Sequence, residues 1–537
     1  MSPLSSAQRA DSPCRHSPLR IGWGTALVCF AIISSSDSAT AQTQHISDSY
    51  PEPFRAADSD GDFPALTLGD LVSGATSTED PAAVDPNATD ELNAPLPNSI
   101  QIAAPIEAAD QLELRDFLER PWVELPIRDV LPLDSSEDTP EPIEEKTKPK
   151  PTTNISIEIQ SDFAWFSQDE DNVAAVGEIP DGAFFRRARF GIFGELYETF
   201  EYRIEFDFAE QARPRFLDVW IAMTDLPLIR NLIVGHYFEP FSLERYSPNR
   251  FITFNERSLA DSFAPVRNMG AMTYGHALEE RLTWAFGFFR SNSDDYGEDV
   301  SFEDGYASTA HATFLAWFEE LNEYQLSLLH LGGSFSYRLP GDDPVRYAAR
   351  PSVRMSQQGV GGVPNFVDTG DILDARHTLL YGVDTAWVHG PFSIQAELMQ
   401  AEVNRRQNDN ATFRGGYIFG SYFLTGESRS YSPTSILGRF REGIFQRVTP
   451  RSNVFDRTTG TGWTGCGAIE LATRWAFIDL NDAGIEGGYL EDMTYGVTWY
   501  LNPYTKGMFN YVRPTLKDPK NGESMADMFS VRFQFEY

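Results

Sequence analysis

Cysteine is scarce in this sequence of 537 residues. The three cysteines are Cys14, Cys29 and Cys466, and the first two lie within the export signal described below. A mature chain with a single thiol forms no internal disulfide and holds no metal site built from cysteines.

Long apolar runs are scarce as well. A helical membrane protein needs about 20 mostly apolar residues for each span, whereas the mean hydropathy here is −0.34 and one comparable run occurs, at 21–33. A transmembrane β-barrel escapes this test, because each strand turns only alternate residues toward lipid. The aromatic content of 13% is compatible with the aromatic girdles of such a barrel, and also with a soluble β-sandwich.

Basic residues are too few to balance the acidic ones. The formal net charge is −35, and nucleic acid is therefore not expected as a partner, because its binding needs a basic face that displaces counterions. Any preference for anions has to come from a local arrangement of arginines.

Motifs of catalysis and of cofactor binding are missing. The sequence has no G-x-S-x-G, H-E-x-x-H, P-loop or C-x-x-C motif, and its eight histidines are scattered. We therefore expect no catalytic residues, no cofactor and no metal site. A hydrolase embedded in a barrel remains an alternative, because serine and histidine brought together only in space leave no motif.

The N-terminus has the pattern of a secretory signal. Arginines precede the apolar core at 21–33, which is too short to span a bilayer, and Ala39-Thr40-Ala41 forms a cleavage site of the A-x-A type. We expect residues 1–41 to be a signal peptide and the protein to be exported.

Residues 42–152 form an acidic extension rich in proline and alanine. They hold 24 acidic and 7 basic residues and few aromatic ones. Such a segment buries too little apolar surface to offset the entropy lost on ordering. We expect it to be largely disordered, with a stiff charged linker near its end.

From about residue 153 apolar and polar residues alternate. The alternation is clearest at 200–208, 392–398 and 529–537, where every second side chain is large and apolar. This period predicts strands with one face in an apolar and the other in a polar environment. A soluble sandwich also alternates, but the export signal and an unbroken β-rich region that ends at the aromatic Tyr537 favour a membrane barrel.

Turns and loops separate these strands in two size classes. Asn502-Pro503 and His389-Gly390-Pro391 are short links suited to hairpins, whereas 291–305, 359–374 and 405–410 are longer and polar. Short turns at one end and long loops at the opposite rim are typical of outer-membrane barrels.

Several blocks of sequence carry a resemblance to a known family. Phe185–Phe208 reads FRRARFGIFGELYETFEYRIEFDF, and Val234–Gly270 reads VGHYFEPFSLERYSPNRFITFNERSLADSFAPVRNMG. WVHGPFSIQAE, GSYFLTGESRSY and WYLNPYTKGMFNYV follow in order, at 387–397, 420–431 and 499–512. Together these blocks, spread over about 150–537, resemble the phosphate-selective porin O and P family.

The resemblance implies an all-β fold, a transmembrane antiparallel barrel of sixteen strands over 153–537, usually trimeric, in the outer membrane. About 24 residues per strand with its turn or loop are compatible with spans of ~10 residues. The resemblance further implies a water-filled channel for passive diffusion of small solutes, with anions or phosphate as candidates. The implied partners are outer-membrane lipid and the barrel-insertion machinery, which reads the final strand.

Arginines are the candidate residues of an anion path, because the guanidinium fork binds phosphate with two hydrogen bonds and is always charged. Alternation on the strand at 185–196 places two arginines on the lumen side, whereas Arg186 breaks the pattern and is expected at the rim. The arginine-rich segment after Phe238 lacks long alternation and is interpreted as a loop folded toward the pore. The candidates are Arg187, Arg189, Arg203, Arg245, Arg250, Arg257 and Arg267.

A structural role for each arginine is the simpler interpretation. Glu239, Glu244, Glu256 and Asp261 lie nearby in the sequence and offer ion pairs. Two alternatives to a channel also remain, namely a barrel that tethers the cell envelope and a soluble β-rich adhesin.

Overall fold

A computed structural model describes residues 150–537, with gaps at 210–212, 295, 301–304, 342, 357–361, 436–437, 439 and 456–464. The expected signal peptide and almost all of the acidic extension lie outside the described residues.

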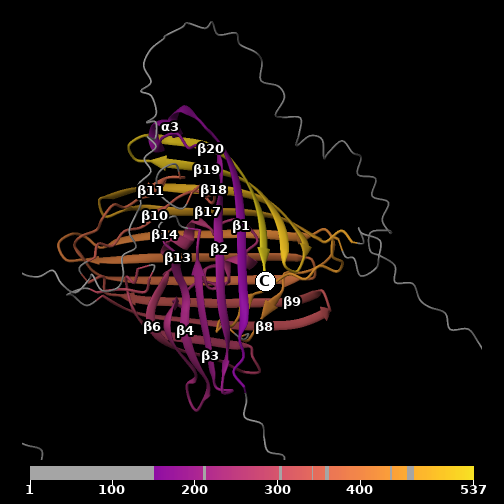
Figure 1. Cartoon of the computed structure of the whole chain (residues 1–537). Helices are drawn as coiled ribbons and strands as arrows, with labels where there is room; N and C mark the ends of the chain where they lie inside the picture. Colours follow the sequence, from indigo (N-terminus) through magenta and orange to yellow (C-terminus); the bar gives the residue numbers. More distant parts are fainter. Residues whose placement is uncertain are drawn as a thin grey trace, which may run out of the picture. The chain divides into compact units, whose positions relative to one another are not determined.

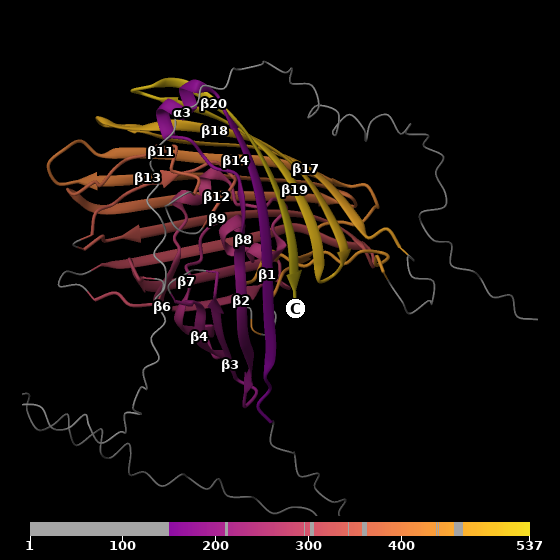
Figure 2. The ribbon, with the colours of Figure 1, turned by 45° about the horizontal axis from the view of Figure 1, so that its top comes forward.

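Sixteen strands close into one antiparallel barrel, as the family resemblance implied. Figure 1 shows the strands wound around the interior. Each strand pairs with its neighbours in chain order, and β1 pairs with β20 to close the ring, so that the indigo and yellow strands lie side by side (Figure 2). The barrel strands are β1 (Asn154–Gln168), β2 (Gly182–Leu196), β3 (Phe200–Asp207), β4 (Arg215–Leu226), β5 (Arg230–Phe238), β6 (Arg267–Ala277), β7 (Leu282–Arg290), β8 (Tyr306–Asn322), β9 (Gln325–Arg338), β12 (Ala375–His389), β13 (Phe392–Arg405), β14 (Ala411–Phe423), β17 (Ala468–Asp482), β18 (Ile485–Asn502), β19 (Thr505–Asp518) and β20 (Gly522–Glu536).

The two faces of the wall have the polarity that the alternation predicted. On β20, Phe529 and Phe533 are about half exposed on the outside, whereas Arg532 and Gln534 are buried in the interior. A soluble sandwich would bury the phenylalanines and expose the arginine. The apolar outside and the charged inside therefore match a barrel surrounded by hydrocarbon.

Connections differ in length between the two ends of the barrel. At the short-turn end every link but one has two to four residues, and the longer loops 239–266, 291–305 and 339–374 lie at the opposite end. The exception is 424–467, which joins β14 to β17 at the short-turn end and was not anticipated from the sequence.

Three long connections fold into the barrel. The first inner loop (239–266) contains α4 (Leu243–Tyr246) and the 3-10 helices η2 (Asn249–Phe251) and η3 (Leu259–Phe263). The second (339–374) contains β10 (Ala348–Ala349) and β11 (Val367–Asp368), and the third (424–467) contains β15 (Tyr431–Ser432) and β16 (Ile444–Phe445). One further helix, α3 (Glu170–Val176), lies between β1 and β2.

Apolar side chains of these loops pack against the inner wall in two clusters. Phe254 and Phe263 of the first inner loop and Phe366 of the second join one cluster with β12–β14, β17–β20 and β1. Phe440 and Phe445 of the third join the other cluster, with β4–β9 and β12. Among the described residues, no helix combines the length and the apolar character that a membrane crossing requires.

Candidate functional site

A β-bulge on β2 sets two consecutive arginines toward the interior. Gln160 of β1 pairs with Arg187 and Ser161 with Phe185, so that Arg186 has no partner in the register. A bulge of this kind directs two neighbouring side chains to one side of the sheet. Arg186 therefore does not lie at the rim as expected; its guanidinium donates to Glu256 of the first inner loop, with Nε–Oε1 and Nη2–Oε2 distances of 2.7 and 3.0 Å.

A cavity of about 470 Å³ opens beside this bulge, between β2, β4–β6 and the first two inner loops. Its polar lining is dominated by arginine, with carboxylates in the minority. The arginines are Arg186, Arg187, Arg189, Arg215, Arg245, Arg257, Arg267, Arg350 and Arg354, and the carboxylates are Glu256, Asp261 and Asp294. The excess of fixed positive charge makes the cavity suited to an anion.

Five of the seven arginines expected from the sequence line this cavity, the exceptions being Arg203 and Arg250. Those two border a smaller neighbouring cavity of about 30 Å³, which shares Arg189 and Arg267 with the large one. The structure therefore divides the candidate arginines between two neighbouring cavities.

Six of these seven arginines form ion pairs. The nearest carboxylates are Asp207 for Arg189 (2.9 Å), Glu205 for Arg203 (2.8 Å) and Arg250 (3.1 Å), Asp218 for Arg267 (2.7 Å), and Asp261 for Arg245 (2.8 Å) and Arg257 (3.9 Å). Arg187 differs: it donates to the amide oxygen of Gln160 at 2.6 Å, and no carboxylate of the described residues lies within 4.0 Å of it. Structural pairing thus accounts for most of the candidates.

The carboxylates proposed from sequence proximity mostly have other partners. Asp261 pairs as expected, but Glu239 pairs with Arg338 at 2.7 Å and Glu244 with Arg474 at 3.3 Å. These partners lie on distant strands, and sequence spacing therefore gave no sign of them.

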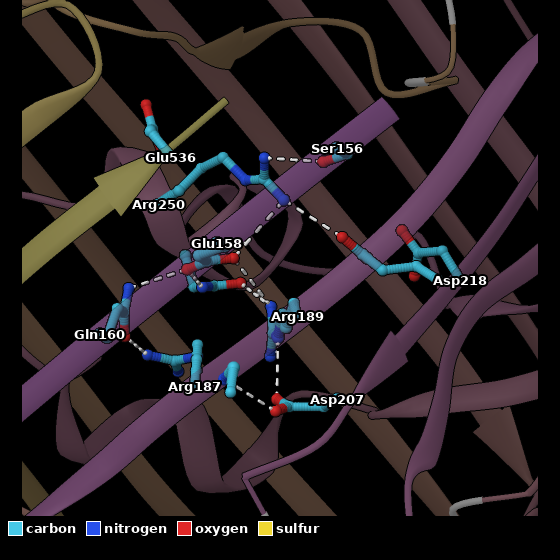
Figure 3. Close-up of polar contacts among 12 residues, drawn as sticks. Ser156, Glu158, Gln160, Arg187, Arg189, Asp207, Asp218, Arg250 and Glu536 are labelled. Carbon is cyan, nitrogen blue, oxygen red and sulfur yellow. Dashed lines mark hydrogen bonds and ion pairs between the residues drawn. The ribbon is translucent and has the colours of Figure 1, made fainter. Parts of the chain in front are cut away.

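Glu158 of β1 ties the arginines of the wall to the first inner loop (Figure 3). Its Oε1 accepts from Gln160 Nε2 at 2.8 Å and from Asn249 Nδ2 at 2.6 Å, and its Oε2 lies 3.4 Å from Arg189 and 3.5 Å from Arg250. Because Asn249 and Arg250 belong to η2, these bonds fix the first inner loop against the wall beside the smaller cavity.

Four cavity arginines were not among the sequence candidates: Arg186, Arg215, Arg350 and Arg354. Arg350 and Arg354 come from the second inner loop, part of which the sequence placed at the outer rim. Arg350 donates to the amide oxygen of Asn365 at 3.1 Å, and Arg354 lies 4.0 Å from Glu256. Among the described residues, Arg187 and Arg350 thus have no carboxylate within 4.0 Å, and Arg354 has Glu256 at the edge of that distance.

Glu256 is a buried carboxylate of the cavity with guanidinium groups on several sides. Burial alone would raise its pKa, but the guanidinium groups of Arg186 and Arg532 hold the pKa well below its ordinary value. It therefore stays ionised at any pH near neutrality.

A third cavity lies nearer the short-turn end of the barrel. The small cavity shares Arg250 with this third one, of about 20 Å³, which reaches the turn at Asn502–Thr505 at the short-turn end. A space of about 10–15 Å³ holds one water, so these two cavities are narrow. Arg203 donates to Gly438 O at 3.1 Å and Arg441 donates to Tyr246 O at 2.9 Å. Through these contacts the third inner loop bounds the cavity of about 30 Å³.

Within the described ranges, no cluster of His, Cys, Asp or Glu is arranged to hold a metal ion.

Comparisons with known proteins agree with this architecture. The family model of the phosphate-selective porin O and P family matches residues 154–537. The chain is 28% identical over 343 residues to an uncharacterized protein of Caulobacter vibrioides, covering 62% of each chain, and thus spans less than two thirds of that relative. It is 25% identical over 396 residues to Porin O of Pseudomonas aeruginosa, covering 67% of this chain and 83% of that one. An anion-selective porin from Comamonas acidovorans is similar at a TM-score of 0.44 and 10% identity, over 72% of this chain and 100% of that one. The chain belongs to the phosphate-selective porin O and P family of outer-membrane channels.

Proposed function

We propose that the barrel is an outer-membrane porin through which small anions, inorganic phosphate among them, diffuse passively along the chain of arginine-lined cavities. The observation that carries this proposal is the excess of arginines over carboxylates around the large cavity, where Arg187 and Arg350 have no described carboxylate within 4.0 Å and Arg354 lies 4.0 Å from Glu256.

An anion that leaves bulk water needs fixed positive charge or hydrogen-bond donors along its way. Guanidinium groups supply both, and their planar fork matches the oxygens of phosphate. The net charge of −35 does not oppose this, because residues 42–152, which precede the first barrel strand in the sequence, hold 24 acidic and 7 basic residues and thus about half of the acidic excess.

A homotrimer is the assembly we propose. Strands β3, β5 and β7 have 8, 9 and 9 residues, whereas β8 and β18 have 17 and 18. The wall is therefore low at β3, β5 and β7, where tilted strands of 8 or 9 residues fall slightly short of an apolar band of ~25 Å. Neighbouring copies of the chain that pack against this low part of the wall would cover the outer surface that the lipid bilayer covers poorly. The barrel-insertion machinery is proposed to read β20, whose outward phenylalanines lead to the exposed Tyr537.

Ion selectivity of purified protein in planar bilayers tests the proposal. We expect discrete conductance steps and a reversal potential in a potassium chloride or potassium phosphate gradient that reports anion preference. The triple variant Arg187→Gln, Arg350→Gln, Arg354→Gln removes the three cavity arginines whose charge is least compensated by carboxylates, and should shift the preference toward cations.

The matched control is Arg346→Gln. Arg346 lies on the same inner loop as Arg350 and Arg354, but its side chain is 51% exposed, pairs with Asp368 at 2.5 Å and does not line the cavity. Its removal should leave the selectivity unchanged. Cation preference of the native protein would contradict the proposal, and absence of any current would favour a structural role in the envelope.

A further inference from the structure

Glu256, a buried carboxylate of the cavity, lies near three guanidinium groups, more than a single structural ion pair requires. We propose that Glu256 sets how tightly the cavity holds its anion: its carboxylate occupies guanidinium groups that would otherwise bind the solute, and this keeps the solute's residence short. The inference rests on the proposed anion channel and adds a specificity-determining residue to it.

Glu256 lies between η2 and η3 on the first inner loop, and 8% of its surface is exposed. Its Oε1 accepts from Arg186 Nε at 2.7 Å and from Arg532 Nη2 at 2.8 Å. Its Oε2 accepts from Arg186 Nη2 at 3.0 Å and lies 4.0 Å from Arg354 Nε. Two oxygens shared among three guanidinium groups form the arrangement that an oxyanion solute would take at the same place.

Neutralising Arg532 does not require Glu256. Asp162 of β1 already binds Arg532 with two hydrogen bonds of 2.7 Å, from Nε to Oδ1 and from Nη2 to Oδ2. Asp162 does not line the cavity, whereas Glu256 does, together with Arg186 and Arg354. Glu256 is therefore not needed to compensate the charge of Arg532, and its carboxylate instead engages arginines that line the cavity.

Conduction requires that a site bind its ion strongly enough to admit it and weakly enough to release it. Nine arginines around one cavity favour admission, and a cavity of about 470 Å³ leaves room for a solute anion beside the carboxylate. A fixed negative charge that shares guanidinium groups with the solute favours release. Without that charge, the anion would bind more tightly and leave more slowly.

The test is the dependence of single-channel current on the concentration of potassium phosphate. We expect Glu256→Gln to lower the half-saturating phosphate concentration about tenfold or more, the low end of what one charge within 4–6 Å does to a charged neighbour. The maximal current should fall with it. Glu256→Asp keeps the charge and should restore the native concentration dependence.

Asp162→Asn is the matched control, because it removes a carboxylate from Arg532 outside the cavity and should leave half-saturation unchanged. An anion-selective native channel with an unaltered half-saturation in Glu256→Gln would overturn this inference and leave the proposed function standing. A native channel without anion preference would overturn both. Glu256→Ser is the second variant: if both it and Glu256→Gln fail to insert as barrels while Asp162→Asn inserts, the carboxylate is structural and the inference is overturned.

Discussion

Arg532 provides a measure of how far ion pairs in the interior stabilise the closed barrel. It lies on the last strand, directly opposite Asp162 of the first, and its side chain is fully buried. It donates to both oxygens of Asp162 at 2.7 Å, to Glu256 at 2.8 Å and to the carbonyl of Asn255. It thus joins the two strands that close the ring to the first inner loop.

Replacement of Arg532 by Met keeps the length of the side chain and removes its charge and donors. Asp162, which is 4% exposed, is then left without its cation, and removal of one partner of a buried pair costs about 3–5 kcal/mol. Because Glu256 retains Arg186, we expect the free energy of unfolding to fall by the lower figure, about 3 kcal/mol. The double variant with Asp162→Asn should recover about 2 kcal/mol of this loss, since the unpaired charge is gone.

Equilibrium unfolding in denaturant, followed by tryptophan fluorescence of barrels folded into lipid vesicles, measures these differences. Arg346→Gln is the control, because an exposed ion pair contributes about 0.2–1 kcal/mol. A loss below about 1 kcal/mol for Arg532→Met, or strict additivity with Asp162→Asn, would refute the reasoning and show that interior water screens the pair.

Three further outcomes follow from the geometry. Because the pKa of Glu256 is held well below its ordinary value, its ion pairs are lost only when the pH falls through that depressed pKa. Between pH 7 and pH 5 the reversal potential should therefore change by the same amount in the native protein and in Glu256→Gln. A Cβ atom at Gly332 would lie 2.1 Å from Oδ1 of Asp384, so Gly332→Ala should reduce the free energy of unfolding by about 1–3 kcal/mol, whereas Gly333→Ala, whose nearest neighbour is at 3.9 Å, should be tolerated. Four guanidinium groups lie 4.0–5.9 Å from the ring of Phe238. Phe238→Leu removes the aromatic face that these groups contact and should weaken anion preference, whereas Phe238→Tyr keeps an aromatic ring and should retain it. Reversal potentials would show the difference.

The strands were predictable because each one alternates between hydrocarbon and the interior, and a period of two is visible in a single sequence. The stretch from Phe200 to Phe208 and the final strand both lie where the alternation placed them. The loop after Phe238 was predictable for the converse reason: it is rich in charge and lacks alternation. What the sequence did not contain was the direction in which the other long connections fold.

Arg186 illustrates the limit most clearly. Alternation on one strand assumes an unbroken register, but the bulge exists only in the pairing of β2 with β1. Arg350 and Arg354 were missed because a polar, glycine-rich loop normally lies outside a barrel. The available signal was the presence of Val353, Phe366 and other apolar residues in that loop, which are buried inside the barrel.

The division between paired and unpaired arginines has a physical reason. An arginine pressed against the wall meets few waters, and leaving it unpaired costs several kcal/mol, so Arg203 and Arg250, which do not line the large cavity, have carboxylate partners. An arginine that faces a cavity of about 470 Å³ keeps part of its hydration, and its charge can stay available to a solute. Selectivity in this barrel is therefore separable from stability: substitution of Arg350 or Arg354 should change the current at nearly constant unfolding free energy, whereas substitution of Arg189 should change both.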